Sequence, residues 1–254
     1  MSKKREIILL IILLLILISI NYPWLDSLVV KEFSGKEEAK VVRVIDGDTF
    51  EMVYNGNKTS VRLLGINTPE KGEFFYAEAK QFTESLVLNK TVELEFGKDK
   101  YDLYHRLLAY VYLNDKNVNE EIINNGFANF YFPEGKDRHY DDFKSTWEEC
   151  LNKNINLCEK SKDICAECIK IKEWNIKGDF VIFENACSFD CDVSSWSVKD
   201  EGRKKFVFGK LVLKGSEEIK LTAEDFKKDY VWTKTGDTLF LRDEDGRLVL
   251  WKGY

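Results

Sequence analysis

The sequence predicts an α+β domain built on a five-stranded barrel of the OB-fold type with three helices, then an all-β sandwich, with an apolar segment before both. Three observations support this prediction. Residues 39–113 contain short runs that alternate apolar and polar side chains around one amphipathic helical pattern. Residues beyond about 160 show almost no helical periodicity, and residues 7–20 are apolar except for one serine. A length of 254 residues suits two domains.

The apolar N-terminal segment, residues 1–30, predicts a transmembrane segment or a signal peptide. As a helix, residues 7–20 would span about 21 Å, short of the roughly 30 Å hydrocarbon core, as in a signal peptide. However, no small-residue cleavage site follows, and Tyr22 and Trp24 lie where aromatic residues anchor a membrane helix. A buried core helix is the third interpretation. Basic residues precede the apolar run, so in the first two cases the rest of the chain is exported.

A polar linker at residues 31–38 leads into the barrel domain, which we expect at residues 39–160. Alternation marks its strands, and Asn55-Gly56 between two of them is a hairpin signal. Apolar side chains at intervals of three and four mark its helices. The expected strands are residues 39–44, 50–54, 60–66, 92–96 and 107–113, and the expected helices are residues 73–87, 117–126 and 141–154.

Residues 161–254 are expected to form the second domain. Short runs of β-branched and aromatic residues recur there, separated by Gly and Asp turns. Strands at such regular spacing are typical of a β-sandwich. The expected strands are residues 168–176, 179–185, 195–200, 204–209, 210–215 and 229–233, with a final hairpin at 237–254.

The cysteines all lie in the second half of the chain and allow two interpretations. The six are Cys150, Cys158, Cys165, Cys168, Cys187 and Cys191. A C-x2-C pair and a C-x3-C pair resemble the ligands of a zinc site. An even number of cysteines in an exported chain favours disulfides instead, with the 165/168 pair joined to the 187/191 pair.

The charge of the chain is acidic and unevenly distributed. The formal net charge is −6, and residues 36–160 carry 17 basic and 23 acidic side chains. An acidic surface does not attract polyanions at long range, which counts against a nucleic-acid substrate. Residues 202–205, with sequence GRKK, are the only basic cluster of the second domain, and they are either a solvated face or a nucleic-acid contact.

The hairpin at residues 43–70 concentrates charge near its ends. With Asn55-Gly56 in the turn, we expect Glu51 opposite Arg62 and Asp48 opposite Gly65. This register brings the Asp48 carboxylate near the Asn67 amide and the Thr68 carbonyl. Hard oxygen donors with positions left for water suit Ca²⁺.

Two further residues near this site could act as a base and as a phosphate-binding group. Glu70, just past Pro69, can accept a proton from water, and Arg62 can hold a phosphate bidentately. A metal, a base and an arginine together are what phosphodiester hydrolysis requires. Asp-Gly-Asp-Thr alone is an ordinary turn and Thr-Pro-Glu alone an ordinary helix start. Their spacing along one hairpin, with an arginine between them, indicates function.

Five segments in order resemble the thermonuclease family, whose fold is that of staphylococcal nuclease: VIDGDTFEMVY, VRLLGINTPE, AEAKQF, DLYHRLLAYVYL and VNEEIINNGFA. The resemblance covers residues 39–160 and implies Ca²⁺-dependent hydrolysis of DNA and RNA on an OB-fold barrel. It implies Asp48, Asn67 and Thr68 as metal ligands, Asp46 as an acid behind them, Arg62, Glu70 and Arg106 as catalytic residues, and Asp102, Tyr104 and Tyr131 as residues that contact the substrate.

The sequence departs from the pattern of the family at several positions. Asn67 stands where an aspartate usually ligates Ca²⁺, so an oxygen is retained, a charge is lost, and weaker metal binding is expected. Leu103 replaces a lysine that would contact a nucleotide phosphate. His105 occupies a position where glycine is common. The stretch at residues 71–76 is shorter than the usual loop beside the cleft, which implies a different substrate preference.

The second domain resembles the lamin-tail family, an immunoglobulin-like β-sandwich. Asn185, Trp196 and the hairpin sequence GDTLFLRDEDG carry that resemblance. It implies a binding module whose ligand is unknown and names no catalytic residue.

Together these observations predict an exported nuclease that is held at the cell membrane by its N-terminal segment, or secreted if that segment is cleaved. Its partners would be DNA, RNA or both, the membrane, and the unknown ligand of the second domain. The alternative is a catalytically silent OB-fold module that binds nucleic acid or protein, which Asn67 and the acidic surface favour.

Overall fold

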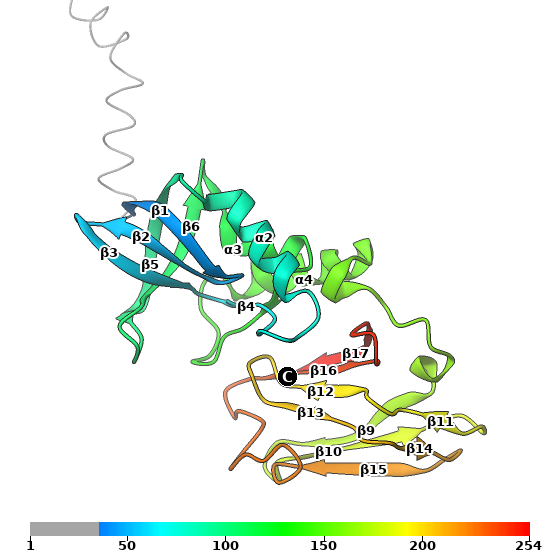
Figure 1. The fold of residues 1–254 in the computed structure, drawn as a ribbon. Coiled ribbons are helices and arrows are strands. Elements are labelled where there is room, and N and C mark those ends of the chain that lie inside the picture. Colours follow the sequence, from blue (N-terminus) through cyan, green and yellow to red (C-terminus); the bar gives the residue numbers. More distant parts are fainter. Residues whose placement is uncertain (1–35) are drawn as a thin grey trace, which may run out of the picture. The chain divides into compact units, whose positions relative to one another are not determined.

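The computed structural model describes residues 36–254 (Figure 1). The predicted membrane segment at 1–30 and linker residues 31–35 lie outside this range. Residues 38–254 form one compact unit, and the following description concerns it. Within residues 36–254, no helix combines the length and the apolar character that crossing a membrane requires.

The first part of this unit is a closed five-stranded barrel, as the sequence predicts. Its strands are β1 (Glu37–Asp46), β2 (Thr49–Tyr54), β3 (Asn57–Leu63), β5 (Thr91–Tyr101) and β6 (Leu107–Leu113). The strand order is β3-β2-β1-β5-β6, and parallel pairing of β3 with β6 closes the barrel. A short strand β7 (Lys116–Asn117) extends the sheet beyond β6. Closure leaves β3 paired on both sides, so the strand that carries Arg62 is held rigidly.

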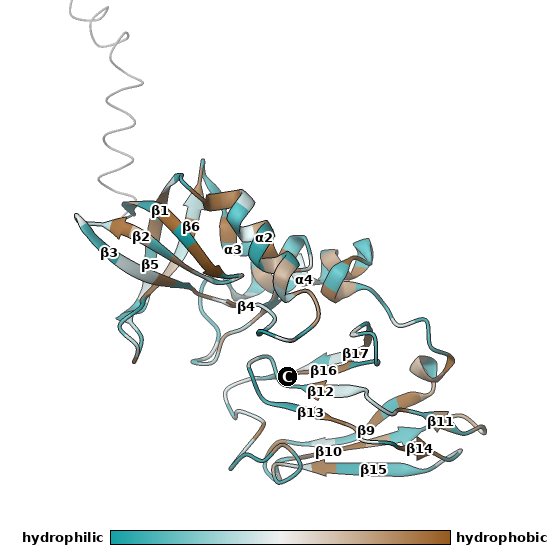
Figure 2. Cartoon of the chain, in the orientation of Figure 1, coloured by the Kyte–Doolittle hydropathy of each residue, from teal (hydrophilic) through white to brown (hydrophobic). Residues whose placement is uncertain are grey.

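Three helices accompany the barrel in residues 36–160, again as predicted: α2 (Tyr76–Val87), α3 (Val118–Asn124) and α4 (Tyr140–Lys153). The Asn117 side chain caps α3 by accepting a hydrogen bond from the Glu120 backbone N–H. Two more short strands, β4 (Ile66–Asn67) and β8 (Asn129–Phe130), pair beside the barrel. Apolar and polar segments alternate along the strands and helices (Figure 2), and Phe50, Tyr110 and Trp147 are fully buried.

The expected register of the first hairpin is wrong by two residues. Arg62 pairs with Thr49, and Glu51 pairs with Ser60. The cause is the turn: Asn55 and Gly56 form a two-residue connection with φ of 50° and 76°, which makes Tyr54 and Asn57 the closing pair. Arg62 therefore lies directly beside the Asp48 end of β2.

The remainder, residues 161–254, is called here the C-terminal β region. Its strands are β9 (Ile169–Asn175), β10 (Phe180–Asn185), β11 (Cys191–Asp192), β12 (Ser197–Lys199), β13 (Lys205–Val207), β14 (Val212–Leu213), β15 (Glu218–Thr222), β16 (Thr238–Arg242) and β17 (Leu248–Gly253). They form sheets in the orders β15-β10-β9, β11-β14 and β13-β12-β16-β17. Short 3₁₀ helices at Asn156–Cys158 and Ile164–Glu167 precede them. The all-β character is confirmed, whereas the boundary at residue 160 stays a prediction.

The C-terminal β region packs directly on the barrel. Phe240 and Leu248 belong to the same apolar core as the barrel strands, and Trp147 of α4 makes edge-to-face ring contacts with Phe240 and Trp251. Edge-to-face aromatic contacts each add about 0.5–1.5 kcal/mol beyond the buried area. This shared core holds one sheet of the C-terminal β region against the barrel.

All six cysteines form disulfides: Cys150–Cys158, Cys165–Cys191 and Cys168–Cys187. The expected joining of the 165/168 pair to the 187/191 pair is confirmed. The zinc interpretation is wrong, because no free thiol remains to ligate a metal.

Candidate active site

The turn between β1 and β2 and the end of β4 meet at Asp48. The backbone N–H and the hydroxyl of Thr68 both donate to Asp48 Oδ2, at 3.1 and 3.0 Å. Asp48 and Thr68 are both buried. Thus two segments that lie twenty residues apart in sequence are joined at one carboxylate.

Arg62 projects from β3 into the same place. Its Nη1 lies 2.6 Å from Asp48 Oδ2, and its Nη2 donates to the Ile66 carbonyl at 3.0 Å and lies 3.5 Å from Asn67 Oδ1. Its side chain is only 10% exposed. A cation that bound to Asp48 would therefore compete with Arg62 for the same carboxylate.

Asp46 supports Asp48 from the other side of the turn. Its Oδ1 accepts the Asp48 backbone N–H at 3.2 Å. Burial, reinforced by the neighbouring Asp48 charge, raises the pKa of Asp46 to about 6. This position fits an acid that lies behind the ligand carboxylate.

Glu70 lies at the rim of the site, one residue after Pro69. Its backbone N–H donates to Glu73 Oε2 at 2.9 Å. Its carboxylate, with the side chain 46% exposed, forms an ion pair at 2.6 Å with Nε of Arg203 from the C-terminal β region. Exposure to solvent leaves room for water to reach Glu70, as a general base needs.

Asn67 is buried, with 1% of the residue exposed. Its Nδ2 donates to the Gly202 carbonyl at 2.9 Å. An aspartate has no such donor. The departure from the family pattern thus coincides with a contact that only an amide can make with the C-terminal β region.

The second predicted arginine, Arg106, lies just before β6, the strand that pairs with β3 next to Arg62. Arg106 contacts Asp102 Oδ2 through Nε and Nη2, both at 2.7 Å, and its Nη1 lies 3.5 Å from the Thr49 hydroxyl. Burial would raise the pKa of Asp102, but hydrogen bonds from Arg106 and from the Tyr104 backbone outweigh it and hold that pKa below its usual range. Asp102 therefore remains charged and orients Arg106.

The turn before Arg106 explains why glycine is common in the family at the position of His105. His105 adopts φ of 60°, a conformation that glycine adopts without strain. The glycine common at this position fits that requirement. Leu103 is almost fully exposed and Tyr104 is largely exposed. Neither side chain is buried against the barrel in this state.

A pocket of about 440 Å³ opens beside the two arginines. Arg62, Asp102, Arg106 and Tyr131 line it together with the backbone around Gly65. Burial, followed by the nearby Asp200 charge, raises the pKa of Tyr131, so its phenol stays neutral. Tyr104 is not among the residues that line this pocket. A pocket with an aromatic ring and two cations suits a nucleotide.

The residues that sequence reasoning missed lie in the loop between β12 and β13, residues 200–204, called here the β12–β13 loop. The Asn129 side chain donates to the Glu201 carbonyl at 2.9 Å, and the Phe132 N–H donates to Glu201 Oε1 at 3.3 Å. The one signal in the sequence was the basic cluster at 202–205, which has the composition of a solvated face. Nothing local indicated that it meets Glu70.

Glu201 is expected to make stability fall as the pH rises. Burial, and secondarily the nearby Asp237 charge, raise its pKa to about 8. The folded state therefore keeps a proton on Glu201 up to about pH 8, whereas the unfolded state releases it near pH 4.5. The free energy of unfolding is thus unaffected by Glu201 below pH 4.5 and falls between pH 4.5 and pH 8. Between pH 5 and 8 we expect wild type to lose on the order of 3 kcal/mol more than Glu201→Gln, as measured by chemical denaturation.

The matched control is Glu244→Gln, which removes an exposed carboxylate from the β16–β17 turn. It should keep the pH dependence of wild type. Equal pH dependence in wild type and Glu201→Gln would show that Glu201 is ionised throughout this range.

The donor set around Asp48 fits a hard divalent cation. Because Nδ2 of Asn67 is held by the Gly202 carbonyl, Asn67 directs its oxygen, like Asp48, to the place that Arg62 now occupies, and a site with few protein ligands leaves positions for water. Among residues 36–254 no group of three His, Cys, Asp or Glu side chains is placed to hold a metal. The fit therefore rests on the Asp48 carboxylate and the Asn67 amide oxygen, whereas Thr68 directs its N–H and hydroxyl at Asp48.

Comparisons with known proteins relate the barrel part of this chain to known nucleases. Residues 60–160 match the family model described as Staphylococcal nuclease homologue. The SPbeta prophage-derived endonuclease YokF of Bacillus subtilis (strain 168) is 34% identical over 147 residues, 53% of this chain and 50% of the relative. Endonuclease YncB of the same organism is 35% identical over 127 residues, 47% of this chain and 60% of the relative.

A third relative is covered more fully. The thermonuclease of Staphylococcus hyicus is 34% identical over 130 residues, which are 48% of this chain and 77% of the relative. The chain thus spans about half the length of the two Bacillus relatives and about three quarters of the staphylococcal one.

Proposed function

Since the chain belongs to the family of staphylococcal nuclease homologues, we propose that it is a nuclease that hydrolyses phosphodiester bonds of DNA, RNA or both. One observation carries the proposal: Arg62 and Arg106 line one pocket with Tyr131, Asp48 contacts Arg62, and Glu70 follows two residues after Thr68, which donates to Asp48. A carboxylate, a base and two arginines in this arrangement match the requirements of phosphoryl transfer.

In this proposal the residues have distinct roles. Glu70 accepts the proton of the attacking water, which its exposure permits. Arg62 and Arg106 hold the phosphate and stabilise the charge that develops on it. Tyr131 and Asp102 line the pocket that receives the nucleotide. Tyr104, whose ring lies 5.5 Å from the Arg106 guanidinium, would close over the nucleotide from the exposed turn.

We assign Ca²⁺ to Asp48, Asn67 and the Thr68 carbonyl, with Asp46 behind them. The ion would supply positive charge against the phosphate. Because Asn67 is neutral and Arg62 already contacts Asp48, the site should bind Ca²⁺ more weakly than one with two carboxylates.

The remaining parts of the proposal concern location and the C-terminal β region. We propose that the chain is exported and held at the membrane by residues 1–30, with the catalytic residues outside the cell. Three disulfides support export, because disulfides persist in oxidising compartments. We further propose that the C-terminal β region is a lamin-tail-like, immunoglobulin-like sandwich that binds an unidentified ligand.

The direct test is to incubate the full-length chain, in a mild non-ionic detergent, with single-stranded and plasmid DNA and with RNA, in Ca²⁺ or in EDTA. We expect cleavage in millimolar Ca²⁺ and none in EDTA. Intact substrates in Ca²⁺, with oligonucleotide binding retained, would favour the alternative of a silent binding module. That alternative is supported by the Arg62 contact, which occupies the Asp48 carboxylate.

A further inference from the structure

The β12–β13 loop is attached to the barrel on both sides of Arg203. On one side, Asn67 binds the Gly202 carbonyl and Asn129 binds the Glu201 carbonyl, each at 2.9 Å. Gly202 also lies against Tyr131, since a Cβ there would come within 3.2 Å of the ring. The backbone that precedes Arg203 is therefore part of the wall of the active site.

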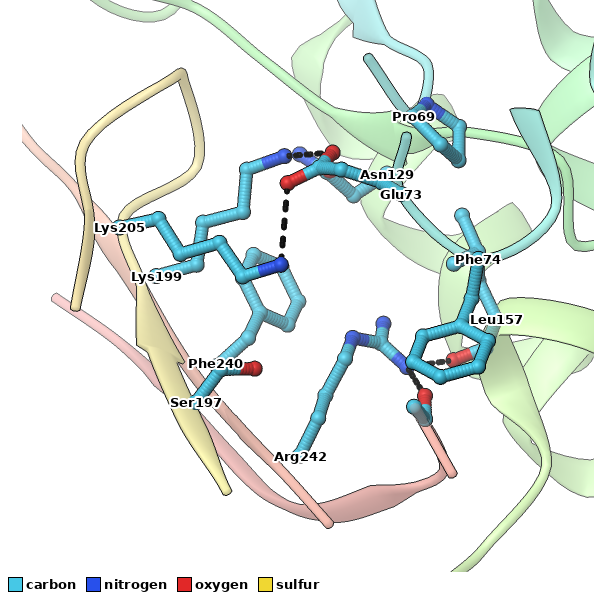
Figure 3. A pocket seen from close by; sticks show the side chains of 11 residues that line it. Pro69, Glu73, Phe74, Asn129, Leu157, Ser197, Lys199, Lys205, Phe240 and Arg242 are labelled. Atoms are coloured by element: carbon cyan, nitrogen blue, oxygen red, sulfur yellow. Dashed lines mark hydrogen bonds and ion pairs between the residues drawn. The ribbon is translucent and has the colours of Figure 1, made fainter. Parts of the chain in front are cut away.

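The strands that flank the loop, one before and one after Arg203, are also held through Glu73. Lys199 at the end of β12 and Lys205 at the start of β13 point toward the Glu73 carboxylate, at 3.0 and 3.3 Å (Figure 3). Glu73 in turn accepts the backbone N–H of Glu70. The segment that carries Glu70 and the loop that carries Arg203 are thus held together at their bases.

Arg203 itself is exposed and incompletely paired. Within residues 36–254 its only ionic partner is Glu70, which it contacts through Nε, and its side chain is 60% exposed. The two Nη groups point to no other described acid. A guanidinium held by Nε presents its two terminal nitrogens as a fork for a phosphate.

The other two arginines of the site are more fully occupied. Arg62 uses both terminal nitrogens on Asp48 and on backbone or amide oxygens, and only 10% of its side chain is exposed. Arg106 uses all three nitrogens on Asp102 and Thr49, with 25% exposed. Arg203 is therefore the guanidinium most available to a polyanion that approaches along the rim.

Resting on the proposed nuclease function, we propose that Arg203 of the C-terminal β region is a third phosphate-binding arginine of the active site. It binds a backbone phosphate of the polynucleotide that lies next to Glu70, and the incoming phosphate replaces the Glu70 carboxylate as its partner. This assignment also explains how a chain with an acidic surface could bind a polyanion. Residues 36–160 carry more acids than bases, and the C-terminal β region supplies a cation where the substrate enters.

The experiment compares the full-length chain with Arg203→Ala, Arg203→Lys and the control Arg43→Ala. Arg43 is a similarly exposed arginine on β1, 66% exposed and paired with Glu51, so its removal matches the change in charge. Binding of a fluorescent oligodeoxythymidylate is measured by anisotropy in EDTA at several salt concentrations. Cleavage kinetics are measured separately in Ca²⁺.

We expect Arg203→Ala to raise Kd about tenfold relative to Arg43→Ala, the size expected for a charge-assisted contact that replaces an exposed ion pair. The slope of log Kd against log salt should fall by about 0.7, the value for one phosphate contact on a single strand. Arg203→Lys should retain the salt slope but lose part of the affinity, because lysine lacks the fork. The loss in cleavage should be found mainly in KM.

Two results would overturn the assignment: a Kd for Arg203→Ala equal to that of Arg43→Ala, or a rise in kcat for Arg203→Ala, which would identify the ion pair as a restraint on Glu70. A wild-type chain that binds the oligonucleotide but does not cleave it in Ca²⁺ would contradict the nuclease function instead. In that case the difference in Kd would still decide the role of Arg203.

Discussion

Glutamine in place of Glu70 should lower the rate of phosphodiester hydrolysis by about 10²–10⁴-fold, the usual contribution of a general base. Glutamine has the shape of glutamate and keeps an oxygen that can accept from Arg203, but it cannot take a proton from water. Because Glu70 is half exposed and its backbone N–H remains bonded to Glu73, the fold should be unaffected. The measurement is kcat/KM on single-stranded DNA in Ca²⁺, with the melting temperature checked in parallel.

The matched control is Glu78→Gln, which removes one exposed carboxylate from the first turn of α2. It should cleave within about threefold of wild type, as expected for a surface substitution away from the site. If Glu70→Gln cleaved as fast as Glu78→Gln, another group would have to accept the proton and the assigned role of Glu70 would be wrong.

The barrel could be predicted because the signals for its strands and turns lie in residues that are close together in the sequence. Alternation along β1 and β2 and the Asn55-Gly56 turn indicate which residues face the core. The register was predicted two residues out, because it depends on whether the turn holds two residues or more. The structure shows a two-residue turn, which places Arg62 next to Thr49 and within reach of Asp48.

The composition of the active site could not be predicted to the same extent. The contact between Asn67 and Gly202 joins residues 135 positions apart. No periodicity or turn signal encodes such a pair, since it forms only after the barrel and the C-terminal β region have folded and packed. The cluster at 202–205 therefore resembled an ordinary charged surface, although Arg203 contacts Glu70.

The disulfides could be predicted in part, less well than the barrel and better than the contacts of residues 202–205. Joining of two closely spaced pairs could be expected from composition and export, but the individual partners depend on the sheet. Pairing of β10 with β9 joins Asn185 to Ile169, which brings Cys187 close to Cys168 and leaves Cys165 to meet Cys191. Connectivity is thus a property of the folded sheets rather than of the spacing.

Asn67→Asp should have opposite effects in the absence and in the presence of Ca²⁺. In EDTA we expect the free energy of unfolding to fall by about 2–3 kcal/mol, because a buried donor to the Gly202 carbonyl becomes a carboxylate oxygen that faces it. In Ca²⁺ the added carboxylate should bind the ion more tightly, so Ca²⁺ should stabilise the variant more than wild type. Denaturant unfolding in EDTA and across a Ca²⁺ titration measures both effects.

Asn129→Asp is the control that separates these effects. Asn129 makes an equivalent hydrogen bond to the same loop, at the Glu201 carbonyl, but it is not among the proposed metal ligands. It should lose a similar amount of stability in EDTA and show the Ca²⁺ response of wild type. Equal Ca²⁺ responses in Asn67→Asp and Asn129→Asp would remove residue 67 from the metal site. Undiminished stability of Asn67→Asp in EDTA would show instead that the Gly202 contact does not hold the β12–β13 loop. If both effects occur as expected, asparagine at position 67 weakens Ca²⁺ binding but holds the β12–β13 loop, which presents Arg203, against the barrel.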